Sequence, residues 1–289
     1  MVGLGAPASL LPLICVYLCS SVANSSAGPD EGPPRAADAA ARLDFFGYTL
    51  VVEADAAERG ARVVEYDRAG RKRWEIAGLR SAMTAQSLPG GRVLIAQFSP
   101  GCVTERDTRG KVLWRHDARD VVYDARRLPN GNALVVTPTR VYEVDRAGRE
   151  AAALTTADIR FAGACKLRGG HTGALTAGGE FVRYDASGKQ VRSFRVGEGG
   201  LSLATVIQAL PNDHIVVALY AQNKVAEFDA DGREVWQASV RRPCSAYRLP
   251  NGHTLVATRL SRVVTELDRK GQVVATLPAG GRVLFASRR

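Results

Sequence analysis

The chain has 289 residues and a formal charge of +10, from 39 basic and 29 acidic side chains. A hydrophobic content of 46% is typical of a packed soluble protein and excludes a chain that is disordered throughout. The basic balance favours anionic ligands and surfaces. Nucleic acid is not expected as a partner, because basic residues are spread among acidic ones and no aromatic-basic recognition segment occurs.

An apolar run stands near the start of the chain, at Ser9–Ala23, and small residues that suit a signal peptidase follow it. The run has the length of a signal peptide, although no Lys or Arg precedes it. We interpret residues 1–27 as a signal peptide and residues 28–44 as a flexible linker. Export to the periplasm or the cell exterior is therefore expected, with no stable membrane insertion after signal removal. The alternatives are an uncleaved anchor and a mispredicted start.

From residue 45 onward one pattern repeats about every 40 residues. Its sharpest marker is Asp-x-x-Gly, preceded by an alternating stretch such as Val141–Val144 that is typical of a strand. The Asp side chain caps a turn and the Gly takes a positive φ, so each marker predicts a hairpin. The marker aspartates are Asp67, Asp107, Asp145, Asp185, Asp229 and Asp268.

Two further features recur within the repeat. Every tryptophan follows a marker Asp by seven residues, in the outgoing strand, where it is expected to fill the space between neighbouring units. The tryptophans are Trp74, Trp114 and Trp236. A second hairpin of the Leu-Pro-Asn-Gly type begins at Leu88, Leu128, Leu167, Leu210 and Leu249. Two hairpins in each period of about 40 residues predict a β-propeller blade of four strands.

The two ends of the repeat region complement each other. The segment Phe285–Arg289 aligns with Ser245–Leu249, and Tyr48–Val52 reads as a second strand without a first. One C-terminal strand and three N-terminal strands would therefore complete one blade, which removes free sheet edges. The prediction is an all-β, six-bladed β-propeller of four-stranded antiparallel blades over residues 45–289, closed by a C-terminal inner strand.

The combination of Leu-Pro-Asn-Gly with Asp-x-x-Gly-(Lys/Arg)-x-x-Trp, as in Asp107–Trp114, resembles the PQQ-like β-propeller repeats over about residues 48–289. This class includes quinoprotein dehydrogenases, outer-membrane assembly lipoproteins and arylsulfotransferase-type propellers. The resemblance implies a fold, while the function depends on the site. Quinoprotein dehydrogenases have eight blades, an adjacent cysteine pair and a calcium site beside the quinone. With six repeats and no such pair after residue 27, we expect no cofactor.

The cysteines and histidines give few candidates for chemistry. The cysteines outside the signal segment share no repeat position or close spacing, so buried thiols are expected rather than a disulfide or a metal site; they are Cys102, Cys165 and Cys244. Three histidines follow the second hairpin at one repeat position and are interpreted as structural polar residues: His171, His214 and His253. His116, between Arg115 and Asp117, is the catalytic candidate, with a solvated loop histidine as the alternative.

Arginines recur in the segments that should join each blade to the next, on one face around the channel. The candidate ligand-binding residues are Arg80, Arg119, Arg160, Arg241 and Arg242. Convergent guanidinium groups could bind carboxylates or sulfates, so an anionic glycan or an acidic protein segment is the expected partner. The alternative is that arginine is simply the common solubilising residue here. The sequence thus favours a binding scaffold, with a sulfotransferase-like or lyase-like enzyme using the central channel as the alternative.

Overall fold

The computed structural model describes residues 47–54, 60–155, 159–197, 201, 205–259 and 261–289. These residues form 24 strands in six sheets of four. Two 3₁₀ turns, Arg168–Gly170 and Tyr220–Gln222, are the helical elements among them. The signal peptide and linker inferred for residues 1–44 lie outside the described residues. Within the described part of the chain, no helix has the length and apolar character needed to cross a membrane.

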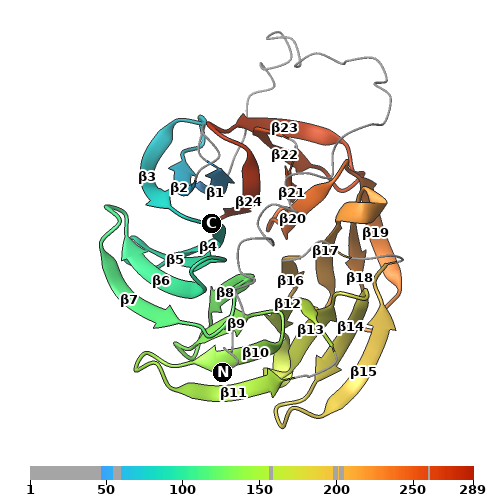
Figure 1. Cartoon of the computed structure of the whole chain (residues 1–289). Coiled ribbons are helices and arrows are strands. Elements are labelled where there is room, and N and C mark those ends of the chain that lie inside the picture. The colour runs from blue at the N-terminus through green and yellow to red at the C-terminus, as the bar shows by residue number, and fades with distance from the viewer. Residues whose placement is uncertain (1–46, 55–59, 156–158, 198–200, 202–204, 260) are drawn as a thin grey trace, which may run out of the picture. The chain divides into compact units, whose positions relative to one another are not determined.

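Each sheet is one blade, with its strands in order from the inner to the outer edge (Figure 1). Blade 1 contains β24 (Val283–Arg288), β1 (Thr49–Ala54), β2 (Ala61–Tyr66) and β3 (Lys72–Leu79). Blade 2 contains β4 (Ala82–Leu88), β5 (Arg92–Gln97), β6 (Cys102–Asp107) and β7 (Val112–Asp117). Blade 3 contains β8 (Asp124–Arg127), β9 (Ala133–Val136), β10 (Arg140–Val144) and β11 (Glu150–Thr155).

The second half of the ring has the same order. Blade 4 contains β12 (Phe161–Lys166), β13 (Thr172–Thr176), β14 (Glu180–Tyr184) and β15 (Gln190–Arg195). Blade 5 contains β16 (Ile207–Ala209), β17 (Ile215–Leu219), β18 (Lys224–Phe228) and β19 (Glu234–Ser239). Blade 6 contains β20 (Pro243–Arg248), β21 (Thr254–Thr258), β22 (Val263–Leu267) and β23 (Val273–Pro278). The predicted all-β, six-bladed propeller is confirmed.

Blade 1 closes the ring in the predicted way. Strand β24 is the inner strand of this blade and pairs with β1 in antiparallel register, with Val51 opposite Ala286 (Figure 1). A buried carboxylate adds a side-chain link, because Glu53 accepts hydrogen bonds from the Gly281 N–H (2.7 Å) and from Arg62 Nε (2.8 Å). The closing strand is thus joined to the rest of its blade by backbone pairing and by a buried charged group.

The Asp-x-x-Gly segments form the hairpins expected from the sequence. In the first, Asp67 Oδ1 accepts hydrogen bonds from the N–H groups of Ala69 (2.8 Å) and Arg71 (2.9 Å). Gly70 has a φ of 75°, which a side chain at this position would disfavour. In every blade the register between the third and outer strands shifts beside this turn. Such bulges increase strand twist, which protects an exposed outer edge from pairing with another chain.

The hydrophobic core lies between blades. Six clusters of buried side chains each join two neighbouring blades, including the pair formed by blades 6 and 1. The half-buried tryptophans pack against three of these clusters, as expected. Trp114 Nε1 donates to the Arg146 carbonyl (3.0 Å) and Trp236 Nε1 to the Arg269 carbonyl (2.8 Å), both in the next blade's Asp-x-x-Gly turn. Each of these two residues therefore binds its outer strand to the following blade.

Candidate functional site

The inner strands of all six blades end around one cavity at the centre of the ring. The cavity has a volume of about 440 Å³ and is lined by the last residues of β4, β8, β12, β16, β20 and β24. A hairpin of the Leu-Pro type follows five of these strands, so we call this end of the channel the hairpin face. We call the opposite end the loop face, because it carries the segments that join each outer strand to the next inner strand.

Basic side chains dominate the polar lining of this cavity, which we call the channel mouth. They come from three inner strands and the residue after β24: Arg126, Arg127, Lys166, Arg288 and Arg289. No Asp, Glu or His is among the described lining residues. Two glutamines also line it, and each binds the backbone of the next inner strand. Gln86 Oε1 accepts from the Arg127 N–H (2.6 Å), and Gln208 Oε1 accepts from the Arg248 N–H (2.5 Å).

A repeated ion pair between blades holds the basic residues. A glutamate of the third strand, two residues before the marker Asp, binds a basic residue at the end of the next blade's inner strand. The pairs are Glu105–Arg127 (2.9 Å), Glu143–Lys166 (3.1 Å), Glu227–Arg248 (2.7 Å) and Glu266–Arg288 (2.6 Å). Burying a charge is costly unless it is paired and hydrogen-bonded, so these pairs fix the orientation of the cations.

The junction between blades 4 and 5 has the opposite polarity. Arg183 stands where the other five blades have the glutamate, and Ala209 stands where four of the other blades have a basic residue. Arg183 Nη2 instead pairs with Asp213 of the next blade (3.1 Å). Asp213 also accepts the Arg168 N–H (2.9 Å) and has a φ of 63° in its hairpin. The positive charge of Arg183 at this junction is therefore compensated by Asp213, which belongs to the hairpin of the next blade.

The three repeat-position histidines belong to the same network. His214 Nδ1 lies 2.7 Å from Glu227, and His253 Nδ1 lies 2.8 Å from Glu266. His171 Nδ1 accepts a hydrogen bond from Arg183 Nε (2.9 Å). Each histidine thus hydrogen-bonds to the charged third-strand residue of its own blade, in agreement with a structural role. Arg92 and Asn132 occupy the same repeat position and bind Glu105 and Glu143.

Comparison of the sequence with known protein families identifies the family of this chain. Residues 103–288 match the family described as outer membrane protein assembly factor BamB. The chain belongs to this family. Membership confirms the resemblance to PQQ-like propeller repeats inferred from the two hairpin motifs. No curated protein matches the chain in sequence.

Solved structures resemble this chain at low sequence identity. A protein of unknown function from Bacteroides caccae is 18% identical, with a TM-score of 0.66 over 83% of this chain and 97% of its own. The Cps50 (Swd1) β-propeller domain of Myceliophteria thermophila is 15% identical, with a TM-score of 0.58 over 81% and 87%. A catalytically inactive virginiamycin B lyase from Staphylococcus aureus, with quinupristin, is 12% identical, with a TM-score of 0.54 over 68% and 70%. These likenesses show the fold alone.

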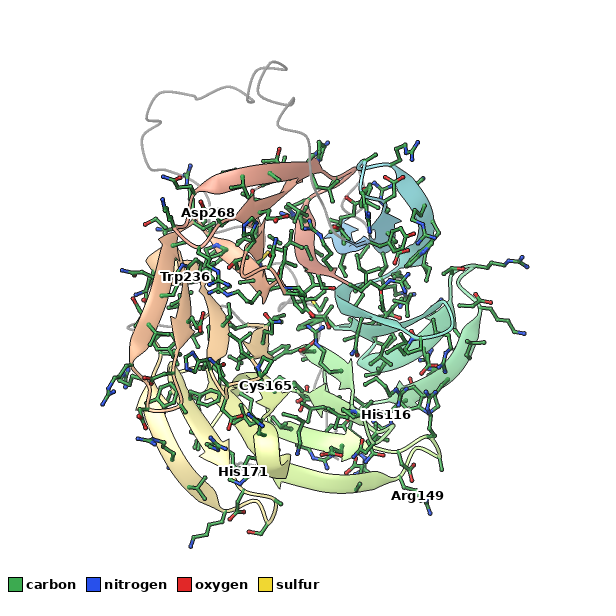
Figure 2. The ribbon with its side chains drawn as sticks, turned by 180° about the vertical axis from the view of Figure 1, so that it is seen from behind. His116, Arg149, Cys165, His171, Trp236 and Asp268 are labelled. Carbon is green, nitrogen blue, oxygen red and sulfur yellow. The ribbon has the colours of Figure 1, made fainter. Side chains whose placement is uncertain are left out.

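His116, the catalytic candidate, lies in strand β7 rather than in a solvated loop. Its ring stacks on Trp114 with centroids 6.2 Å apart, and Nε2 is 2.9 Å from the Tyr142 hydroxyl. Burial lowers the pKa of His116 and raises the pKa of Tyr142 to about 12, so both groups are neutral at pH 7. The side chain faces the junction of blades 2 and 3. In Figure 2 it lies farther from the ring centre than Cys165, which lines the channel mouth.

The structure places the predicted arginines on the loop face. Arg80, Arg119, Arg160 and Arg241 are exposed, and Arg242 is half-buried with a φ of 48°. None of these side chains has a hydrogen bond or ion pair to the described residues, whereas the cations of the channel mouth are paired. The sequence pattern predicted ligand-binding residues on this face and predicted none at the channel mouth. The overlooked signal was a glutamate two residues before the marker Asp and a basic residue one position before the marker Leu.

The remaining candidate groups are thiols. Cys102, Cys165 and Cys244 are free; the first two are buried and the third is half-buried. Burial raises the pKa of Cys165 and of Cys244 to about 12, which leaves both thiols protonated and poorly nucleophilic. Among the side chains that the structure describes, no three of His, Cys, Asp and Glu form a group that could hold a metal ion.

Proposed function

We propose that this member of the BamB family is an exported binding scaffold whose loop face binds an acidic segment of a partner protein. The observation that carries the proposal is the set of exposed arginines on one face, Arg80, Arg119 and Arg160 foremost. Because these guanidinium groups form no hydrogen bond or close ion pair with a carboxylate among the described residues, they can bind an external carboxylate without breaking an internal ion pair.

Two further features support this function. The apolar run Ser9–Ala23 favours export, and the family description concerns an assembly factor for outer membrane proteins, which favours a protein partner. The alternative of an enzyme in the channel has less support, because no Asp, Glu or His is among the described residues that line the channel mouth.

The test is charge reversal on matched sets. The variant Arg80→Glu, Arg119→Glu, Arg160→Glu is compared with Arg109→Glu, Lys189→Glu, Lys270→Glu, which alters exposed residues of the hairpin-face turns. Fluorescence anisotropy measures binding of a labelled glutamate-rich peptide at low and physiological salt. We expect the loop-face variant to lose at least about tenfold in affinity and the control variant to bind like the wild type.

Two outcomes would contradict the proposal. Equal weakening by both variants would reduce the interaction to nonspecific charge, since the net charge change is the same. Binding of heparin but not of the peptide, with loss in the loop-face variant alone, would replace the protein partner by an anionic glycan.

For export, N-terminal sequencing of the mature protein from fractionated cells should find a start after about residue 27.

A further inference from the structure

The channel mouth on the hairpin face has the dimensions of a small-molecule site. Its volume of about 440 Å³ lies within the range usual for ligand pockets. Apolar side chains occupy the channel beside it, because Val206 of blade 5 packs in one cluster with Leu50 and Phe285 of blade 1. Leu50 and Val206 also line the cavity. The polar groups therefore lie at one end of the channel, and apolar side chains fill the part of the channel next to them.

The charge around this cavity is strongly positive. Its cations have carboxylate partners, but several of those carboxylates are shared with further cations outside the cavity. Glu105 binds Arg127 together with Arg92 and Arg146. Glu65 likewise binds Arg289 together with Arg73. A concave site with an excess of one charge and low-dielectric walls concentrates the field on a ligand of opposite charge.

Hydrogen-bond donors remain available within this positive site. Arg126 binds Asp124 only through Nε (3.2 Å), and its guanidinium lies 4.9 Å from the ring centre of Phe285, a residue of blade 1. The terminal nitrogens of Arg126 have no hydrogen bond to the described residues. Arg127, whose side chain is 7% exposed, has a buried Nε that lacks a partner among those residues. The Arg127 guanidinium lies in the seam between blades 2 and 3, where Nη1 donates to the Gly131 carbonyl (3.0 Å) and the group is 4.6 Å from the ring centre of Trp114. The donors that remain available at the cavity are therefore those of Arg126.

We propose that the channel mouth binds a small polyanion, a molecule with at least two phosphate or carboxylate groups, at a site separate from the loop face. Arg126 is its principal ligand, and Arg289 provides a second guanidinium at the same cavity. The inner strand positions Arg126 before the ligand arrives, because Asp124 binds its Nε and Gln86 binds the backbone N–H of the neighbouring Arg127. Preorganisation of this kind favours affinity for a small charged ligand.

A second hollow extends the site towards blades 5 and 6. It has a volume of about 1300 Å³ and shares Gln208, Tyr247, Arg288 and Arg289 with the channel mouth. Trp236 and the two Leu-Pro hairpins of these blades line it further out. A ligand larger than the central cavity therefore has room on this side, while its anionic groups remain near the arginines.

Isothermal titration calorimetry with pyrophosphate and with citrate tests the proposal. Inorganic phosphate and acetate serve as probes with a single anionic group. We expect the two polyanions to bind and the single-group anions to bind at least about tenfold more weakly. The variant Arg126→Gln should lose at least about tenfold in affinity for the polyanions. Arg149→Gln is the matched control, because Arg149 lies on a hairpin-face turn with 82% of its side chain exposed (Figure 2).

Each result of these titrations either supports or contradicts the proposed polyanion site. No heat with any polyanion, or equal weakening by Arg126→Gln and Arg149→Gln, would overturn the site. Preference for pyrophosphate over citrate would identify phosphate chemistry, and the reverse would identify carboxylate chemistry. If Arg126→Gln does not fold, Arg289→Gln replaces it, since 45% of the Arg289 side chain is exposed. The loop-face triple variant should bind pyrophosphate normally, which separates this site from the proposed partner surface.

Discussion

At the scale of single residues, the glutamates of the third strands are the most important for stability. Glu105 is fully buried and binds three arginines, two of them in the next blade. Burial alone would raise its pKa, but the hydrogen bond from Arg146 and the charges of Arg146, Arg127 and Arg92 outweigh burial and lower it. A carboxyl group with a lowered pKa stabilises the folded state above its unfolded pKa, and this stabilisation is lost as the pH falls.

We therefore expect Glu105→Gln to lower the free energy of unfolding by about 3 kcal/mol at pH 7, because it leaves Arg127 buried without a counter-charge. The matched control is Glu150→Gln, whose ion pair with Arg140 is partly exposed and should be worth at most about 1 kcal/mol. Urea unfolding at several pH values measures both. The difference between Glu105→Gln and the wild type should shrink as the pH falls below the ordinary pKa of glutamate, because the wild-type carboxyl becomes protonated as the pH passes through its lowered pKa. A pH-independent difference would contradict the charge-based account.

At the scale of the element, the seam between neighbouring blades is built from one outer strand and the following hairpin. Trp236 in β19 packs against the cluster of blades 5 and 6, lies under the Arg248 guanidinium at 4.2 Å and donates to the Arg269 carbonyl. The side chain is only half-buried, yet it contacts an inner strand and a turn of the next blade. Its role is to join blades, which is why the residue recurs at one repeat position.

Replacing Trp236 by Ala should lower the free energy of unfolding by about 3 kcal/mol, the lower end of the range for buried aromatics. Trp236→Phe retains most of the apolar contact and loses only the hydrogen bond, so about 1 kcal/mol is expected. Thermal melts followed by circular dichroism measure both variants. Similar losses for Phe and Ala would mean that the hydrogen bond dominates, and no loss for Ala would show that the seam does not depend on this residue.

At the scale of the whole propeller, stability depends on closing the ring. Strand β24 pairs with β1 and packs against β20 and β4, so it contacts the blades on both sides. Blade 1 would otherwise expose the edge of β1, and blades 6 and 2 would lose their shared neighbour. Because each cluster of the core joins two blades, an open ring leaves two of the six clusters incomplete.

Deletion of Val283–Arg289 should therefore cost most of a total stability of about 5–15 kcal/mol and promote aggregation. Differential scanning calorimetry and size-exclusion chromatography provide the measurements. Deletion of Arg289 alone, which follows β24, is the control and should lower the melting temperature far less. A truncated chain that melts like the wild type and stays monomeric would contradict closure by β24.

How much of the structure could be predicted from the sequence depends on how far apart the interacting residues lie in the chain. The turns at Asp67 and Leu128 were predictable, because an Asp cap and a positive-φ Gly act within four residues. His116 was assigned to a loop or a catalytic role from its sequence neighbours Arg115 and Asp117. It lies in β7 and not in a loop, and the Trp114 ring and the Tyr142 hydroxyl contact it there. Tyr142 belongs to another blade, so local sequence carried no sign of the contact.

The sequence by itself determined the blade count, the strand order and the closure, because hairpin chemistry is local and the repeat copies it along the chain. The tertiary structure decided where charge accumulates. Arg127 meets Glu105, 22 residues earlier, only because consecutive blades pack side by side. Arg126 contacts Phe285 only because the ring brings the inner strands of blades 3 and 1, which are not neighbours, together at the channel. Closure of the ring gathers the inner-strand ends at one point and so creates the basic channel mouth, since no single repeat contains enough of its residues to reveal it.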